Sequence, residues 1–187
     1  MLAPIESAPD PVRALEDFIG DGRYREATAL CAKEHGPSVG RLCMAMLGNQ
    51  AEAQEVAQET FLAAYQGMAK FRAEGSVRAW LFGIARRQCA RRLQRGPKRH
   101  LELVVDKHAG TETSDSGLKD KQQREELQER LKILKPSERE VLLLRFAGEL
   151  NFKEVAKLLD ISEATARKRA SRALARLRTQ IQQENTQ

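Results

Sequence analysis

The sequence predicts an all-α protein, built as two small helical domains joined by a flexible linker. Good helix formers such as Ala, Leu, Glu, Arg and Gln dominate its 187 residues, and aromatic residues make up only 5%. Apolar residues recur at helical spacing along most of the chain. The length suits one ordinary domain or two small ones. A β-sandwich, a β-barrel and a disulfide-knit secreted scaffold do not fit this composition.

Shifts in composition predict where the domains begin and end. The first residues hold three prolines and little periodic pattern, and Gly96–Pro97 stops a helix before a polar, charge-balanced stretch with few large apolar groups. The predicted parts are a disordered leader at residues 1–11, a helical domain at 12–96, a linker at 97–122 and a helix-turn-helix domain at 123–183.

In the first domain, helices are expected at residues 12–19, 27–34, 37–47, 51–71 and 77–95. Pro37 suits the first turn of a helix, Gly48–Asn49 suits an end, and Ser76 can cap the last helix of the domain. Leu62 is expected on the inner stripe of the 51–71 helix, together with Val56.

The second domain contains the pattern of a helix-turn-helix. Ser137–Glu140 and Asn151–Glu154 read as capping boxes, each at the start of a helix. A short turn at 160–162 follows the helix 152–159, and a long basic helix follows the turn. Two helices joined by a three-residue turn are typical of DNA-binding domains.

Charge is unevenly distributed along the chain, whose formal net charge is +6. Residues 71–100 carry nine basic and one acidic side chain, and residues 150–187 carry eight and four. The rest of the chain has more acidic than basic residues. Two separated basic patches predict a polyanion that is contacted at two places, with acidic surface left for another partner.

The long basic helix carries the more specific of the two patches. Ala166, Ala170, Leu174, Leu177 and Ile181 recur at steps of three or four and form its packing stripe. The opposite face has basic and hydroxyl side chains near the helix N-terminus, where a recognition helix meets base edges and phosphates. The alternative is a solvated helix of an ordinary bundle. The predicted DNA contacts are Thr165, Arg167, Lys168, Ser171 and Arg172.

The other patch, residues 86–99, holds seven basic side chains and no acidic one, and Trp80 lies just before it. Basic residues beside an aromatic ring suit a nucleic-acid backbone with exposed bases. The alternatives are a core position for Trp80, which shares a stripe with Leu81 and Ile84, and a solvated face for the arginines.

No pattern of catalysis, metal binding or membrane insertion is found. The chain has no P-loop, GxSxG or HExxH motif, so it is not expected to be an enzyme, and no cofactor is expected. Cys31, His35 and Cys43 lack the paired spacing of a structural zinc site, so no metal is expected either. Three irregularly spaced cysteines and the absence of a signal sequence or a long apolar run indicate a reduced, cytoplasmic protein.

Three segments, in this order and separated by a linker, resemble the extracytoplasmic-function (ECF) sigma factors of bacterial RNA polymerase. Ala51–Tyr65 resembles the helix that binds the polymerase clamp. Phe71–Arg92 resembles the segment that melts and reads the −10 element. Leu134–Arg145, followed by 152–167, resembles the −35-binding domain. The resemblance covers residues 12–183.

The resemblance implies a sigma factor that binds core polymerase and directs promoter-specific initiation. The residues that it implies are Glu55, Gln58 and Glu59 for core polymerase, and Arg72, Trp80, Arg87, Gln88 and Arg91 for the −10 element. Arg87 stands where members commonly have Asn, and Arg91 where they often have Asp. The alternative is a stand-alone helix-turn-helix regulator with a helical sensor domain.

The resemblance also implies partners. Core RNA polymerase and promoter DNA are expected. So is an anti-sigma factor, because members are usually restrained by one and this chain has no recognisable sensor domain. The chain is expected in the cytoplasm, where such a partner can hold it at the inner membrane. Direct membrane insertion is not expected.

Overall fold

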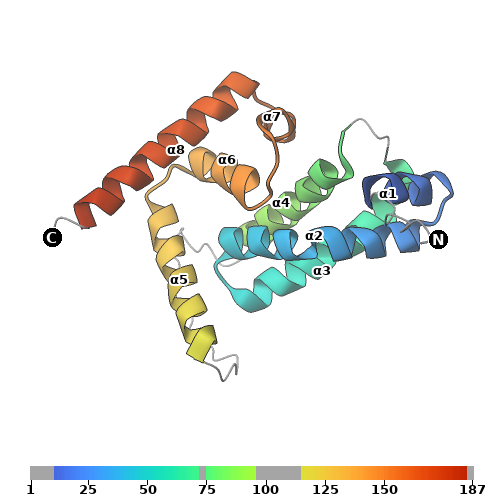
Figure 1. Cartoon of the computed structure of the whole chain (residues 1–187), viewed down its shortest axis with the longest axis horizontal. Coiled ribbons are helices and arrows are strands. Elements are labelled where there is room, and N and C mark those ends of the chain that lie inside the picture. Colours follow the sequence, from blue (N-terminus) through green and yellow to red (C-terminus); the bar gives the residue numbers. More distant parts are fainter. Residues whose placement is uncertain (1–10, 72–74, 96–114, 185–187) are drawn as a thin grey trace, which may run out of the picture.

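The computed structural model describes residues 11–71, 75–95 and 115–184. These residues form helices and contain no strand (Figure 1). The first group comprises α1 (Pro11–Gly20), α2 (Tyr24–Leu47), α3 (Gln50–Gly67), the 3₁₀ turn η1 (Met68–Lys70) and α4 (Val77–Arg95). The second comprises α5 (Asp115–Lys132), α6 (Pro136–Phe146), α7 (Phe152–Leu159) and α8 (Glu163–Glu184).

These helices agree with the all-α prediction, and the second group contains the predicted helix-turn-helix. Its first helix, α7, has the predicted bounds and ends at Leu159.

The long helix α2 corrects the prediction of two helices that meet at Pro37. Pro37 lies inside α2, although proline has no N–H to donate to the carbonyl of Lys33. Cys31 and Val39, on either side of it, are both buried in the same core, so packing holds the two halves of the helix in line. Tertiary burial therefore outweighs the local cost of the proline.

The predicted end of α2 at Gly48–Asn49 and the predicted cap of α4 at Ser76 are confirmed. Gly48 ends α2 in the left-handed conformation, with φ 73°, and its N–H donates to the Met44 carbonyl. The Asn49 side chain accepts a hydrogen bond from the Glu52 N–H and caps α3. Ser76 accepts one from the Ala79 N–H at 3.1 Å and caps α4. These caps fix how α2, α3 and α4 turn back on one another.

The predicted capping box at Ser137–Glu140 is wrong. α6 begins at Pro136, and no side chain caps its first turn. Proline suits that position because its missing N–H would have had no partner in the helix. Glu138 is buried instead, and its Oε2 lies 3.3 Å from Nε of Arg176 on α8. Glu140, the acid that suggested the local cap, accepts a hydrogen bond from Arg86 of α4.

The helix-turn-helix is built as predicted. Asn151 and Glu154 form a capping box at the start of α7, and each side chain bonds the other residue's N–H at 2.9 Å. Asp160 ends α7 in the left-handed conformation, and the Ser162 hydroxyl accepts from the Thr165 N–H at 3.1 Å. On α8, the small residues Ala166, Ala170 and Ala173 are buried, which lets α8 lie close to α6 and α7.

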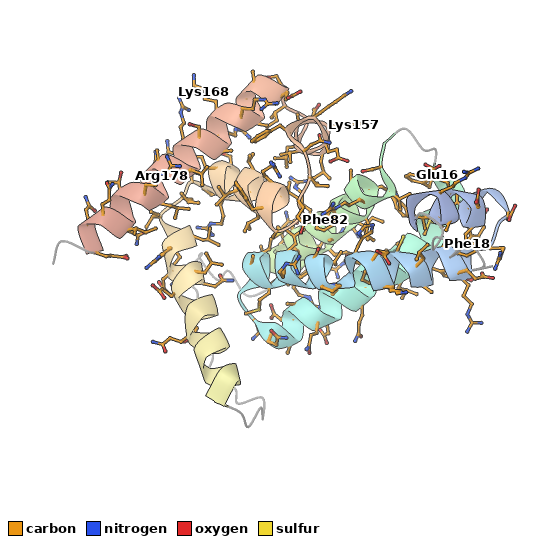
Figure 2. All side chains as sticks on the ribbon, viewed as in Figure 1. Glu16, Phe18, Phe82, Lys157, Lys168 and Arg178 are labelled. Atoms are coloured by element: carbon orange, nitrogen blue, oxygen red, sulfur yellow. The ribbon has the colours of Figure 1, made fainter. Side chains whose placement is uncertain are left out.

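The two groups of helices are in contact (Figure 1). Phe82 of α4 is fully buried where α4 meets the turn between α6 and α7 (Figure 2). A Cβ on Gly148 in that turn would lie 2.9 Å from the Phe82 ring and 2.7 Å from the Leu144 carbonyl oxygen, so only glycine permits this approach. We call the stretch 148–158, which contains this turn and most of α7, the α6–α7 corner.

Polar contacts surround the buried Phe82. Arg78 donates to Glu149 at 2.6 Å, and Arg86 donates to Glu140 at 2.6 Å. The Ser76 hydroxyl donates to Glu154 at 2.5 Å. The hydrogen bond from Arg78 is the main cause of the lowered pKa of Glu149. The two groups of helices are therefore joined by apolar packing and by complementary charges.

The structure also bears on the expected linker and leader. α5 begins at Asp115, so residues 115–122 are helical and do not belong to an irregular linker. Good helix formers such as Leu118, Lys119 and Gln122 continue the pattern of α5 backwards into this stretch. Residues 1–10 of the predicted leader at 1–11 and the stretch 96–114 lie outside the described residues, whereas Pro11 is the first residue of α1. Among the described helices, none is both long enough and apolar enough to cross a membrane.

Candidate nucleic-acid interface

The outer face of α8 is basic and open to solvent. Lys168, Ser171 and Arg172 are exposed, and Lys168 projects away from the body of the protein (Figure 2). Neither Lys168 nor Arg172 forms a hydrogen bond or ion pair with a described residue. Two cations without an internal partner, near the N-terminus of the second helix of a helix-turn-helix, are suited to bind a polyanion.

Two other predicted DNA contacts on α8, Arg167 and Thr165, interact with neighbouring side chains of the protein. Nη2 of Arg167 donates to Glu163 at 2.6 Å, and its guanidinium lies 4.8 Å from the centre of the Phe152 ring. The Thr165 and Ser162 hydroxyls lie 2.8 Å apart. Arg167 therefore packs on the first residue of α7 and pairs with Glu163, while its side chain remains 61% exposed to a ligand.

The basic patch on α4 is divided by its packing. Arg87, Arg91 and Arg95 follow one another at steps of four and are exposed, so they form one open stripe. Arg86 and Arg92 instead turn toward acidic side chains of α6 and α3. The sequence has no acid within 86–99, but the fold brings acids from other helices to two of its arginines.

The Trp80 side chain lies partly in the core and partly at the surface. It is half-buried, its ring lies 5.2 Å from that of Phe71 at a tilt of 53°, and a Cβ on Gly67 would be 3.2 Å from it. The rest of the ring lines a pocket of about 430 Å³, together with Gly83 and Arg87. An aromatic face beside an exposed arginine is suited to stack on an unpaired base.

The far wall of this pocket belongs to the second group of helices. Glu154, Lys157 and Leu158 of α7 complete it, and Leu158 lies close to Gly83. The α6–α7 corner therefore covers one side of the α4 surface that the sequence predicts to bind nucleic acid. Gln88 is half-buried on α4, and the remaining predicted residue, Arg72, lies outside the described residues.

The outer face of α3 carries the three residues predicted to bind polymerase. Glu55, Gln58 and Glu59 are all exposed. Leu62 and Tyr65 continue this face and are 58% and 48% exposed. The prediction that Leu62 lies on the inner stripe is therefore wrong, because Val56, Thr60 and Ala64 fill the buried side of α3.

Within the described residues, no group of three or more His, Cys, Asp or Glu side chains that could hold a metal ion is found. The three cysteines are reduced and buried, and burial raises the pKa of Cys31 to about 11. Burial is also the main reason that the pKa of His35 is lowered.

Comparison with known proteins identifies the two groups of helices. The family model described as Sigma-70 region 2 matches residues 31–99, and the model described as Sigma-70, region 4 matches residues 130–179. Region 2 thus spans most of α2 through α4, and region 4 spans α6, α7 and most of α8. The two basic patches lie one in each matched region.

Relatives of the whole chain agree with this identification. The ECF RNA polymerase sigma factor SigW of Bacillus subtilis is 29% identical over 75% of this chain and 81% of its own length. RfaY of Xanthomonas campestris pv. campestris, described as a probable RNA polymerase sigma factor, is also 29% identical, over 78% of this chain but only 38% of its own length.

Two solved structures share the fold. CnrH, in complex with the cytosolic domain of CnrY, has a TM-score of 0.72 and 22% identity, and the match covers 92% of this chain and 98% of CnrH. The sigma factor RpoE of Bartonella quintana, in complex with the anti-sigma factor NepR, has a TM-score of 0.57 and 23% identity, over 78% of this chain and 91% of RpoE. The chain therefore belongs to the sigma-70 family, and within that family it is an ECF sigma factor.

Proposed function

We propose that this sigma factor binds core RNA polymerase through the outer face of α3 and contacts one promoter at two places. The observation that carries the proposal is the arrangement of charge on regions 2 and 4. Each region presents one basic surface, and the face of α3 between Glu55 and Tyr65 has no basic residue. A surface that binds protein beside DNA is best kept free of charges that attract DNA.

Core polymerase would be bound by Glu55, Gln58 and Glu59. Leu62 and Tyr65 extend this surface with exposed apolar area, which is the kind of side chain that is buried at the centre of protein interfaces. The resemblance to the clamp-binding helix of the family rests on the same stretch, 51–65.

The −10 element would be bound by α4. Trp80 offers a ring to an unpaired base, and Arg87 and Arg91 offer donors to the phosphates of a melted strand. Gln88 lies beside them, and Arg72 belongs to the same predicted set. The arginines at 87 and 91 replace residues that are common in the family, so the base preference at the −10 element would be this protein's own.

The −35 element would be bound by α8 in the major groove. Arg167 is exposed and can make a bidentate contact with guanine, whereas Lys168 and Arg172 can reach phosphates. Thr165 and Ser171 add hydroxyl donors along the same face. Residues 12–96 would thus act as one unit on core polymerase and the −10 element, and 123–183 as another on the −35 element.

The closed contact between regions 2 and 4 would be the inactive form of the protein. The α6–α7 corner occupies one side of the pocket beside Trp80, where a −10 base would need room. An anti-sigma partner would stabilise this form, and the complex of RpoE with NepR supports a partner of this kind. The protein would then act in the cytoplasm without chemistry of its own, and its partner could hold it at the inner membrane.

A stand-alone helix-turn-helix regulator is the other candidate, and it is not favoured because the first group of helices matches region 2. Reconstitution with purified core polymerase separates the two. We expect the protein to bind core polymerase and to direct initiation at defined sites in a genomic fragment library. A regulator would bind DNA alone and would leave the start sites of core polymerase unchanged.

A further inference from the structure

Arg92 on α4 bridges two acidic side chains of α3. Its Nη1 donates to Oε2 of Glu55 at 2.7 Å, and its Nη2 donates to Oε1 of Glu59 at 3.2 Å. The Arg92 side chain is 30% exposed, whereas those of Glu55 and Glu59 are 64% and 49% exposed. The guanidinium is therefore tucked against α3, and the two carboxylates remain open to a partner.

This geometry sets Arg92 apart from the other arginines of its patch. Arg87, Arg91 and Arg95 lie at steps of four along the exposed face of α4, and Arg92 lies about one hundred degrees away from Arg91, on the side of α3. The charges of Glu55 and Glu59 already satisfy it. Arg92 belongs to the basic run in the sequence, but its contacts connect it to the acidic surface.

The two acids are one helical turn apart, and a free glutamate samples many rotamers. A guanidinium presents several N–H donors in a fixed plane, so one Arg92 can hold both carboxylates at once. The hydrogen bond that Arg92 donates to Glu55 is the main cause of the raised pKa of Arg92, and the charges of Glu55, Glu59 and Glu52 add to it. Arg92 remains charged throughout the physiological pH range.

We propose that Arg92 is a positioning residue of the polymerase-binding surface, which holds the Glu55 and Glu59 carboxylates in the geometry that a basic surface of core polymerase meets. This inference rests on the proposed function of α3. Because the two carboxylates are ordered before binding, less side-chain freedom is lost when the complex forms. Two acids and one arginine also leave a net negative charge for the partner.

The test measures the affinity of the full chain for core polymerase in the absence of DNA. The variants are Arg92→Gln, Glu59→Gln, Glu55→Gln with Glu59→Gln, and that pair combined with Arg92→Gln. Arg92→Lys retains the charge but not the planar fork, and it also serves if Arg92→Gln does not fold. Arg25→Gln, at an exposed arginine of α2, is the matched control for the loss of one positive charge.

We expect Arg92→Gln to weaken core binding by about three- to tenfold, Arg92→Lys to weaken it less, and Arg25→Gln to leave it unchanged. In the background that lacks both carboxylates, Arg92→Gln should have no further effect. A merely structural role would instead weaken binding equally in both backgrounds, and this result would overturn the inference.

Unchanged or tighter binding by Arg92→Gln, in a protein where Glu59→Gln weakens binding, would also overturn it and would leave the proposed surface intact. If Glu59→Gln and the double variant Glu55→Gln with Glu59→Gln both bind core polymerase as well as the wild type does, the proposed polymerase surface is wrong. The proposed role of Arg92 is then wrong as well.

Discussion

Reversing the charge of Glu59 tests the proposed polymerase contact at a single residue. Glu59→Arg places a positive charge on a surface that we expect to meet basic residues, so core binding should fall by at least about tenfold. The side chain is exposed, and the fold should therefore be retained. The measurement is a pull-down or titration with core polymerase, and circular dichroism checks the helices.

Glu16→Arg is the matched control, because Glu16 is an exposed acid on α1, which carries none of the predicted contacts (Figure 2). It makes the same change of charge elsewhere. Equal affinity of Glu59→Arg and Glu16→Arg for core polymerase would contradict the assignment of α3.

The buried cysteines give a prediction about the reactivity of their thiols at pH 8. All three are buried, and the raised pKa of Cys31, about 11, keeps its thiol protonated at pH 8. Since the thiolate is the reactive form, the raised pKa protects Cys31, whereas the pKa of Cys43 is lowered by its hydrogen bond with Cys89 and only burial protects that thiol. Iodoacetamide should therefore modify none of the three in the native protein at pH 8 and all of them in denaturant. Mass spectrometry counts the adducts. Rapid labelling of the native protein would contradict the packing of α2 against α4.

The sequence predicted correctly which residues are buried or exposed where helical spacing alone decides the burial. Ala166 and Ala170 are buried, and Lys168 and Arg172 are exposed, as the periodicity of α8 requires. The prediction failed for Ile181, predicted on the packing stripe of α8 but 37% exposed, and for Leu62, because Val56, Thr60 and Ala64 fill the buried side of α3. The partners of Arg92 lie on a different helix, so no local pattern could have revealed them.

At the scale of elements, α8 can be tested through salt. Lys168 and Arg172 are proposed to neutralise phosphates, so Lys168→Gln and Arg172→Gln should each reduce the slope of log K against log salt by about one. The measurement is a salt titration of holoenzyme on a target promoter. Arg25→Gln on α2 should leave the slope unchanged. Unaltered slopes in both α8 variants would mean that α8 does not meet the backbone.

The start of a helix was predictable wherever its cap is local. The box at Asn151 and Glu154 needs only four residues, and it is present. The box expected at Ser137 is absent because α6 begins one residue earlier, at Pro136, and Glu140 pairs with Arg86, which is far away in the sequence. Pro37 likewise marks a helix start by local rules, but burial on both sides of it keeps α2 continuous.

For the whole molecule, the contact between regions 2 and 4 should be weakened by reversing charges on its region 4 side. Glu140→Lys with Glu149→Lys turns the pairs with Arg86 and Arg78 into repulsions. We expect spin labels on α1 and α8, introduced as Glu16→Cys and Arg178→Cys, to move apart in the free protein. Double electron–electron resonance measures this separation, and the buried native cysteines should not react with the label.

The same reversal made at other exposed acids, Glu34→Lys with Glu163→Lys, changes the net charge equally and is the control. It should leave the separation as in the parent. A single ion pair near the surface contributes little, about 0–1 kcal/mol, so both pairs are reversed to act against the burial of Phe82. Equal separations in both double variants would contradict the role of these pairs in the closed form.

The sequence could predict two helical units but not how they meet. The contact depends on Gly148, which lets the α6–α7 corner approach Phe82, and on charges more than fifty residues apart. Such pairs follow from the three-dimensional arrangement alone.

The most direct test of the central claim is crosslinking from two positions in one complex. A photoreactive group placed at Gln88 on α4, or at Lys168 on α8, is activated in a complex of promoter DNA with reconstituted holoenzyme. We predict that position 88 crosslinks to the single-stranded −10 segment and position 168 to the duplex −35 segment of the same promoter, both only when core polymerase is present. Crosslinks from both positions to one segment, or equal crosslinking without core polymerase, would contradict the account.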